Sequence, residues 1–367
     1  MMIVESFRNK EFIEAILKKI QEKIKKIGFS PKIMEVCGTH TMTIHKFGLR
    51  KLLKDSGIEM LSGPGCPVCV TPNEIVEASI DLLSNHRNLI LATFGDMTRV
   101  PTKKGSLLTS IPAEGSFKKI VYSPEECLNI AKENRDKEVV FLGAGFETTI
   151  PSIAFTIIRA FKEKIYNFSL LSALWLIPPP LQAIVKSEEI NINGFLYPGH
   201  VSTIIGKKPY EFIANEYKIP GTITGFEPVD ILLGINDILD QILESNPLVT
   251  IQYKRAVRPE GNPKAMNMIY EVFEKKDANW RGLGLIPQSG LKLKEELSQF
   301  DAERKFNLKI KSQSKDLRGC RCGDVLKGKI SPPECPSFGK TCSPESPRGP
   351  CMVSFEGACL AYYKYGY

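Results

Sequence analysis

Three short stretches in the first third of the chain decide the fold: KIMEVCGTHT (residues 32–41), EMLSGPGCPVC (59–69) and NLILATFGDM (88–97). Each begins as a short apolar run and ends in glycine, cysteine or polar residues. Segments with helical spacing of their apolar residues separate the three runs. Short buried runs that alternate with helices are typical of β-α-β units with parallel strands. The sequence therefore predicts an α/β fold.

The same alternation continues further along the chain. The later strand-and-turn units are EVVFLGAGFETTIP (138–151), GFLYPGHVSTIIG (194–206) and GTITGFEPVDILLG (221–234). They also echo the first units weakly, since GHVSTII resembles GTHTMTI. Repetition of one supersecondary unit indicates a repeat architecture. We therefore predict two Rossmann-like parallel-sheet α/β domains in pseudo-repeat.

The pattern suggests four segments. An amphipathic helix with its apolar stripe over 11–27 lies within an N-terminal segment, residues 1–30. The first α/β domain is expected at 31–117 and the second at 118–250. After about residue 250 a helix is followed by loops rich in glycine, proline and cysteine, so 251–367 is expected to be a third domain organised by an iron–sulfur cluster.

Composition narrows the class of protein. The chain has 367 residues, 43% of them hydrophobic and 25% charged, which suits a globular protein. No apolar run reaches the length of a membrane span, and the lysine-rich N-terminus lacks a signal-peptide core. The formal charge is +8, and residues 303–329 hold nine basic and three acidic residues. Without further basic stripes we interpret that block as a solvated face. We expect a cytoplasmic protein that binds neither nucleic acid nor membrane.

Ten cysteines in such a chain indicate metal or redox chemistry, because a reducing cytosol disfavours structural disulfides. Cys127 stands alone and is expected to be a buried helix cysteine. Cys37 follows a predicted strand and precedes a helix, where backbone N–H groups favour a thiolate that acts as a nucleophile or metal ligand. Thr39 and His40 lie beside it. His40 is a candidate ligand, proton shuttle or hydrogen-bond donor.

Two other histidines carry no functional expectation. His45, with its apolar neighbours, is expected in the core and His86 at the surface.

Cys66 and Cys69 form a Cys-x-x-Cys pair just before a predicted helix. This spacing favours a redox dithiol or a metal-transfer pair. Half of a zinc site is the alternative, although the chain has no second Cys-x-x-Cys.

Polar residues also mark the carboxyl ends of other predicted strands. Asp96, Glu147, Glu227 and His200 each follow such a strand. In open α/β sheets these ends form the ligand-binding edge. We expect the three carboxylates and His200 to line one cleft, where they handle protons or bind a cation. A phosphate-binding glycine loop is not found, since neither GxxxxGK[ST] nor Rossmann spacing occurs.

The last part of the chain gathers six cysteines. Gaps of 14, 6 and 16 residues separate four of them, and such irregular spacing favours a cubane iron–sulfur cluster over paired zinc knuckles. Zinc stays open as an alternative. The expected cluster ligands are Cys320, Cys335, Cys342 and Cys359, which leaves Cys322 and Cys351 as a nearby dithiol.

Several long motifs together resemble one known family. They are MEVCGTHTMTIHKFGLR, LSGPGCPVCVTP, TFGDMTRVP, GAGFETTIP, GFLYPGHVSTIIG, TGFEPVDIL and GPCMVSFEGAC. In collinear order from about residue 30 to the C-terminus, they are similar to the HypD family of hydrogenase maturation factors. The resemblance implies two α/β domains and a third domain with a [4Fe–4S] cluster. It implies a maturation scaffold with redox-active thiols rather than a conventional turnover enzyme.

The resemblance also implies specific partners and residue roles. A HypC-like small chaperone would share the iron of a transient Fe(CN)2CO group at Cys37, and a HypE-like protein would donate cyanide transiently. Cys66 and Cys69 would be the redox-active pair, in a thiol relay to the cluster similar to that of ferredoxin:thioredoxin reductase. Two alternatives to the scaffold remain: an iron–sulfur disulfide reductase and a zinc-organised binding module.

Overall fold

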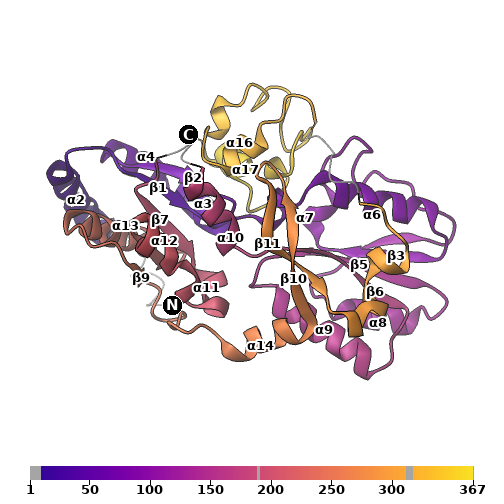
Figure 1. The fold of residues 1–367 in the computed structure, drawn as a ribbon. Coiled ribbons are helices and arrows are strands. Elements are labelled where there is room, and N and C mark those ends of the chain that lie inside the picture. Colours follow the sequence, from indigo (N-terminus) through magenta and orange to yellow (C-terminus); the bar gives the residue numbers. More distant parts are fainter. Residues whose placement is uncertain (1–9, 188–190, 311–316, 367) are drawn as a thin grey trace.

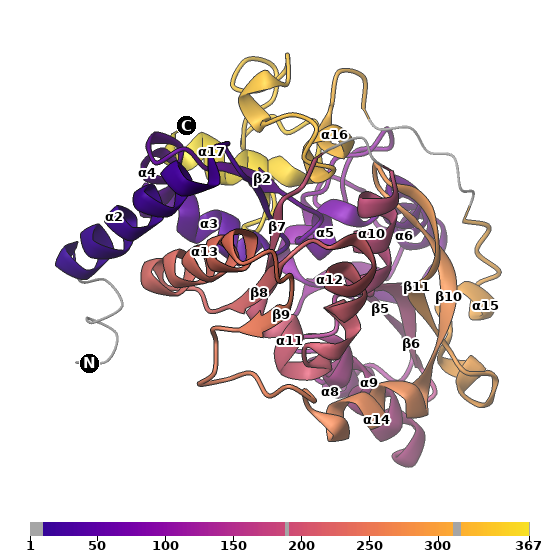
Figure 2. The same ribbon diagram turned by 60° about the vertical axis from the view of Figure 1, so that its left-hand side comes forward.

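The computed structural model describes residues 10–187, 191–310 and 317–366 (Figure 1). Its first element is helix α2 (Lys10–Ile27), which confirms the amphipathic helix expected over 11–27. The residues before it, 1–9, lie outside the described part of the chain. Ile16, Leu17 and Ile20 are the buried residues of α2, and the helix packs along α13 (Pro228–Leu243). Figure 2 shows these two helices side by side.

The first sheet has five strands in the order β2-β1-β7-β8-β9, and all neighbours pair in parallel. Its strands are β1 (Lys32–Glu35), β2 (Glu59–Ser62), β7 (Gly194–Pro198), β8 (Gly221–Thr224) and β9 (Val249–Ile251). The helices of this half, besides α2 and α13, are α3 (Gly38–Lys46), α4 (Leu49–Asp55), α11 (Gly199–Ile205) and α12 (Glu211–Tyr217).

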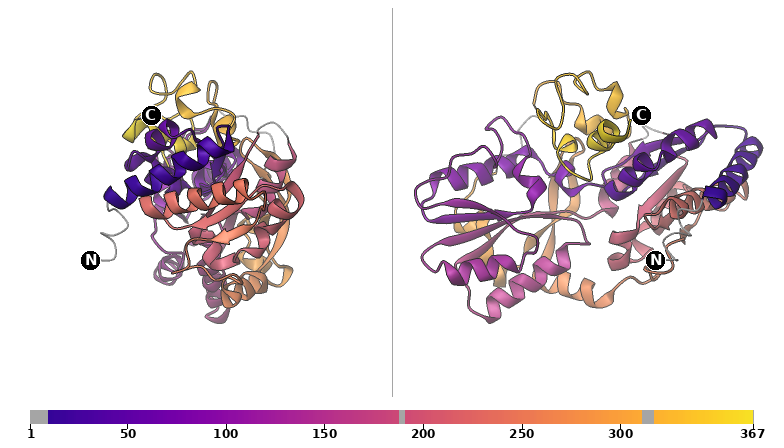
Figure 3. Two further views of the ribbon diagram at one scale, coloured as in Figure 1. Left: turned by 90° about the vertical axis from the view of Figure 1, so that its left-hand side faces the viewer. Right: turned by 180° about the vertical axis from the view of Figure 1, so that it is seen from behind.

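The second sheet has four strands in the order β4-β3-β5-β6, again all parallel. Its strands are β3 (Leu89–Thr93), β4 (Phe117–Ile120), β5 (Glu138–Gly145) and β6 (Phe168–Leu174). The helices between β2 and β7 are α5 (Pro67–Val70), α6 (Asn73–Asn85), α7 (Gly95–Thr98), α8 (Glu126–Glu133), α9 (Ile150–Lys162) and α10 (Pro178–Lys186). Two parallel sheets flanked by helices confirm the predicted α/β class. Figure 3 shows the two sheet units side by side.

The sheets group the strands differently from the expected order along the chain. β3 does not join β1 and β2, as the first predicted unit requires, but pairs with β4 and β5. Residues 31–117 therefore contribute strands to both sheets, and so do residues 118–250. Apart from the largely exposed strand β4, most of these strands are short buried runs, so their sequences identify them as strands without specifying their neighbours.

A hairpin occupies part of the region expected to be loops. After α14 (Pro263–Val272), strands β10 (Phe273–Trp280) and β11 (Gly284–Leu293) pair in antiparallel fashion. The hairpin lies against β6, where the Leu176 N–H donates to Ser289 O at 2.9 Å. Arg281, at the hairpin turn, donates to Thr71 O at 2.8 Å. The hairpin thus reaches the segment that follows α5.

The cysteine-rich end of the chain lies over the junction of the two sheet units (Figure 1). Its helices are short: α15 (Ala302–Lys305), α16 (Cys322–Leu326) and α17 (Ala358–Tyr365), of which α17 packs on α3. One hydrophobic core joins residues of both sheets, the hairpin and this end. Within the described ranges, no helix combines the length and apolar character that crossing a membrane requires.

Candidate functional site

Cys37 lies where β1 ends and α3 begins, in contact with the glycine loop that follows β2. The Gly38 N–H donates to Gly65 O at 3.0 Å. A Cβ on Gly65 would lie 2.3 Å from the Cys37 backbone nitrogen, so only glycine fits this approach. The strand ends therefore hold the CGTHT and GPGCPVC motifs against each other, as parallel strands β1 and β2 predict.

The surroundings of Cys37 favour the thiol over the thiolate. Burial raises its pKa to about 12, Glu356 and Glu35 add to the rise, and the backbone N–H groups of α3 only partly oppose it. The expected thiolate stabilisation at the helix start is therefore outweighed. A soft metal ion that binds the sulfur displaces this proton.

Glu35 is a buried carboxyl group that the sequence analysis missed. Its Oε2 accepts from the Cys37 N–H at 3.0 Å, and its Oε1 accepts from the Thr41 hydroxyl. Burial raises the pKa of Glu35 to about 8, with the Thr41 hydroxyl and the Cys37 N–H opposing the shift. The available signal was a lone acid at the carboxyl end of a buried strand, two residues before Cys37.

His40 is fully buried behind Cys37. Its Nε2 lies 2.9 Å from Gly225 O and 3.0 Å from Thr224 Oγ1, while its Nδ1 has no hydrogen-bond partner. Burial lowers the pKa of His40 to about 4, so the imidazole is neutral. With the Nε2 proton donated to the Gly225 carbonyl, Nδ1 keeps an unpaired acceptor.

His200 is exposed and stacks on Phe226, with ring centroids 3.9 Å apart. Phe226 also contacts the ring of His40, at 5.0 Å. The two histidines are thus connected through one aromatic ring, and burial lowers the pKa of His200 as well.

The segment Ser354–Gly357 (SFEG), here called the SFEG loop, closes over the Cys37 motif. The Thr39 hydroxyl donates to Glu356 Oε1 at 3.4 Å. A Cβ on Gly38 would lie 2.3 Å from Glu356 O, so the two backbones are in direct contact. Burial raises the pKa of Glu356 to about 7. Sequence analysis missed Glu356 and Ser354, because they contact residues some three hundred positions away.

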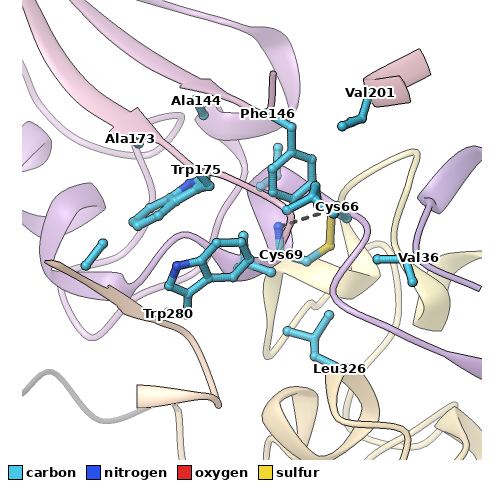
Figure 4. Packing of buried hydrophobic residues seen from close by; sticks show 14 of the residues in the cluster. Val36, Cys66, Cys69, Ala144, Phe146, Ala173, Trp175, Val201, Trp280 and Leu326 are labelled. Atoms are coloured by element: carbon cyan, nitrogen blue, oxygen red, sulfur yellow. Dashed lines mark hydrogen bonds between the residues drawn. A yellow bond between two sulfur atoms is a disulfide. The ribbon is translucent and has the colours of Figure 1, made fainter. Parts of the chain in front are cut away.

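Cys66 and Cys69 form a disulfide inside the core, with exposed fractions of 3% and 0%. Figure 4 shows Phe146, Trp280 and Leu326 around it. The Cys69 N–H donates to Cys66 Sγ at 3.1 Å. The two cysteines of the Cys-x-x-Cys motif are thus bonded to each other and shielded from solvent.

The three predicted carboxylates have separate surroundings. Asp96 Oδ2 accepts from the Phe355 N–H at 2.9 Å, which ties the start of α7 to the SFEG loop. Glu147 is buried; its Oε1 accepts from the Ile177 N–H at 3.0 Å and its Oε2 has no partner. Burial raises its pKa to about 7. Glu227 forms a capping box with Asp230 at the start of α13.

The expected arrangement of the three carboxylates and His200 in one cleft stays a prediction. Asp96 lies at the SFEG loop, Glu147 inside the core and Glu227 at a helix end. The capping box explains the carboxylate at Glu227, because it stabilises the start of helix α13. A lone acidic residue before proline commonly has this structural role.

All six C-terminal cysteines line one small, partly open cavity. The sulfur atoms of Cys322 and Cys351 lie 2.8 Å apart. A Cβ on Gly349 would lie 2.6 Å from Cys320 Sγ, so glycine leaves room for this thiol. Among the residues described, no three histidine, cysteine or acidic side chains converge on a single metal ion.

The remaining predictions concern residues outside this site. Cys127 is fully buried in α8, which confirms the structural interpretation. His45 is buried against Tyr362, with ring centroids 4.0 Å apart, and its place in the core is also confirmed. His86 is half-buried and contacts Phe306, so it is less exposed than expected.

The fold and the site define an α/β protein with three thiol centres around the junction of two parallel sheets. A family model described as "HypD: Hydrogenase formation hypA family" matches residues 11–366. The hydrogenase maturation factors HypD of Rhodobacter capsulatus and Escherichia coli are each 40% identical over 374 and 370 residues, covering 100% of this chain and 98% of each relative. HypD of Cupriavidus necator is 39% identical over 373 residues, 100% of this chain and 97% of the relative.

The chain therefore belongs to the HypD family of hydrogenase maturation factors. This confirms the family resemblance inferred from the motifs.

Proposed function

We propose that this protein is the scaffold on which the Fe(CN)2CO group of [NiFe]-hydrogenases is assembled, with a HypC-like chaperone and a HypE-like cyanide donor. The observation that carries the proposal is the SFEG loop, which contacts Thr39 beside Cys37 and also the Cys66 sulfur. The loop lies in the chain between Cys351 and Cys359, two of the cysteines that line the six-cysteine cavity. The loop therefore connects the three thiol centres, which supports the proposal that they act together on one bound iron.

Cys37 is the proposed anchor for the substrate iron. Thiolate is the soft ligand that such iron prefers. Binding requires the Cys37 proton to leave, and the Glu35 and Glu356 carboxyl groups flank the thiol, with pKa values of about 8 and 7. Each can hold or release a proton near neutral pH. The Nδ1 of His40 is a buried acceptor without a partner in the same motif as Cys37.

The cysteine-lined cavity suits a [4Fe–4S] cluster. Such a cluster spreads four thiolates around four irons, so its ligands need not converge on one point. The 2.8 Å contact of Cys322 and Cys351 favours these two as a separate dithiol. We therefore propose the remaining four, Cys320, Cys335, Cys342 and Cys359, as the cluster ligands. When bound, the cluster would supply electrons one at a time.

The test is the infrared spectrum of the protein co-produced with its HypC-like and HypE-like partners and purified without oxygen. We expect bands of metal-bound cyanide and carbon monoxide that disappear in Cys37→Ala. They should persist in the matched control Cys127→Ala, which also loses one buried thiol. Bands that survive in Cys37→Ala would contradict the anchor.

The buried disulfide favours one second candidate, an iron–sulfur disulfide reductase. That function predicts turnover of a protein disulfide by Cys66 and Cys69 without iron at Cys37. A silent infrared spectrum from protein that holds both partners and an intact cluster would favour it. Stoichiometric zinc without iron would instead support the zinc-organised binding module.

A further inference from the structure

Ser354 joins the buried disulfide to the SFEG loop. Its hydroxyl oxygen lies 3.3 Å from Cys66 Sγ and 3.2 Å from Asp96 Oδ2, and it accepts from the Glu356 N–H at 3.2 Å. The side chain is 1% exposed, so water does not compete for these contacts. One hydroxyl therefore lies between the redox pair and a carboxylate.

The hydroxyl has a single proton to share between two acceptors. In the disulfide form, Cys66 Sγ is a weak acceptor and the Asp96 carboxylate a strong one, so the proton is donated to Asp96. After reduction, a thiolate on Cys66 is a strong acceptor as well. The Cys69 N–H already points at this sulfur, at 3.1 Å, which makes Cys66 rather than Cys69 the site of the negative charge.

We propose that Ser354 is a positioning residue that stabilises the Cys66 thiolate of the reduced pair by turning its hydroxyl from Asp96 to the sulfur. The inference rests on the proposed redox role of Cys66 and Cys69. A dithiol reductant supplies two electrons and becomes a disulfide, and the Cys66–Cys69 bond breaks. Cys69 keeps one of the reductant's two protons as a thiol, and the second is released to solvent.

The rotation of the Ser354 hydroxyl also changes the contacts of the SFEG loop. Asp96 loses the hydroxyl contact and keeps only the Phe355 N–H. The same loop carries Glu356, whose carboxyl group accepts a hydrogen bond from the Thr39 hydroxyl. A change in the redox state of the pair therefore alters the contacts of the Cys37 motif.

The experiment counts the protons taken up when the pair is reduced. Full-length protein is equilibrated anaerobically in dithiothreitol buffers at a series of pH values. The thiol state of Cys66 and Cys69 is read by mass spectrometry after denaturing alkylation. Reduction takes up two protons below the pKa of the Cys66 thiol and one above it, so the break in the pH dependence locates that pKa.

Three variants and a control test the role of the hydroxyl. Loss of a hydrogen bond to a charged group in Ser354→Ala should move the break up by about one pH unit, a tenfold change in acidity. Ser354→Thr keeps the hydroxyl and should restore the break. Asp96→Asn frees the hydroxyl and removes a negative charge, so the break should move down. Ser79→Ala, which removes another buried hydroxyl, one that donates to Ile75 O rather than to the pair, should leave it unchanged.

The outcomes separate this inference from the proposed function. A pair that interconverts normally, with the same break in Ser354→Ala as in the unmodified protein, overturns the role of Ser354 alone. A pair that never exchanges between thiol and disulfide in any buffer overturns the redox role, and this inference falls with it.

Discussion

The cysteines of this protein are held in two different ways. Cys37 and Cys66 follow strands of a five-stranded sheet, and backbone bonds such as Gly63 N–H to Glu35 O at 2.8 Å fix the turns that carry them. The six cysteines at the other end lie on turns and helices no longer than the eight residues of α17. Short helices contribute little stability of their own. The first region is therefore formed by the fold itself, whereas the second would gain further support from bonds to the proposed cluster.

The largest expected effect is loss of the proposed cluster. In Cys342→Ala, or in protein prepared without iron and sulfide, amide hydrogen exchange over residues 317–366 should accelerate by a hundredfold or more. Bonds to the metal supply much of the folding free energy of such regions, and a hundredfold corresponds to about 3 kcal/mol. Strand β3 should keep its protection from exchange in these samples. In the control variant Cys127→Ala, all regions should exchange as slowly as in the unmodified protein. Unchanged exchange in the cluster-free protein would remove the contrast between the regions.

A smaller effect is expected where the sheet holds Cys37. Gly65→Ala places a Cβ 2.3 Å from the Cys37 nitrogen, and the backbone must shift. We expect about 2–3 kcal/mol lower stability in urea unfolding and weaker cyanide and carbon monoxide bands. Gly95→Ala is the control, because its Cβ would meet Ile120 Cγ2 at an ordinary 3.8 Å. Equal stability of the two variants would mean that the approach of the two turns is not needed.

The smallest effect concerns the buried carboxyl group of Glu35. Its pKa in the folded protein, about 8, lies above the ordinary 4.5, so its contribution to stability is full below pH 4.5 and is lost as the pH rises to 8. Glutamine imitates the protonated acid, accepting from the Cys37 N–H and donating to the Thr41 hydroxyl. Glu35→Gln should therefore gain on the order of 2 kcal/mol at pH 8 and little at pH 4.5.

Urea unfolding at several pH values provides the measurement for Glu35→Gln. Glu59→Gln, an exposed glutamate on the neighbouring strand, should follow the unmodified protein. A Glu35→Gln curve parallel to that of the unmodified protein would show that the carboxyl group is ionised inside the fold.

Much of the architecture could be predicted from local patterns. The helix over 11–27, the strand that ends at Cys37 and the buried place of Cys127 follow from apolar spacing within a few residues. Sheet membership could not be predicted. The pairing of β3 with β5 depends on which buried strands meet, and short apolar runs are interchangeable in this respect.

The candidate site was likewise predictable only in part. Its cysteines were identified by type and spacing, but the contacts that tune them come from far along the chain. Ser354 and Cys66 are 288 positions apart, and the side chain of Glu356 reaches Thr39 over 317. The high pKa of Cys37 could not be predicted either, because the sequence indicates a helix start but not the depth of burial.

The chain has only two tryptophans, and both belong to the core cluster around the Cys66–Cys69 disulfide (Figure 4). Their rings contact each other, with centroids 5.5 Å apart. A disulfide accepts an electron from an excited indole and quenches its emission. The tryptophan fluorescence of this protein therefore originates beside one bond, and it would brighten when that bond opens. The two tryptophans are therefore an intrinsic fluorescence reporter of the redox state of Cys66 and Cys69.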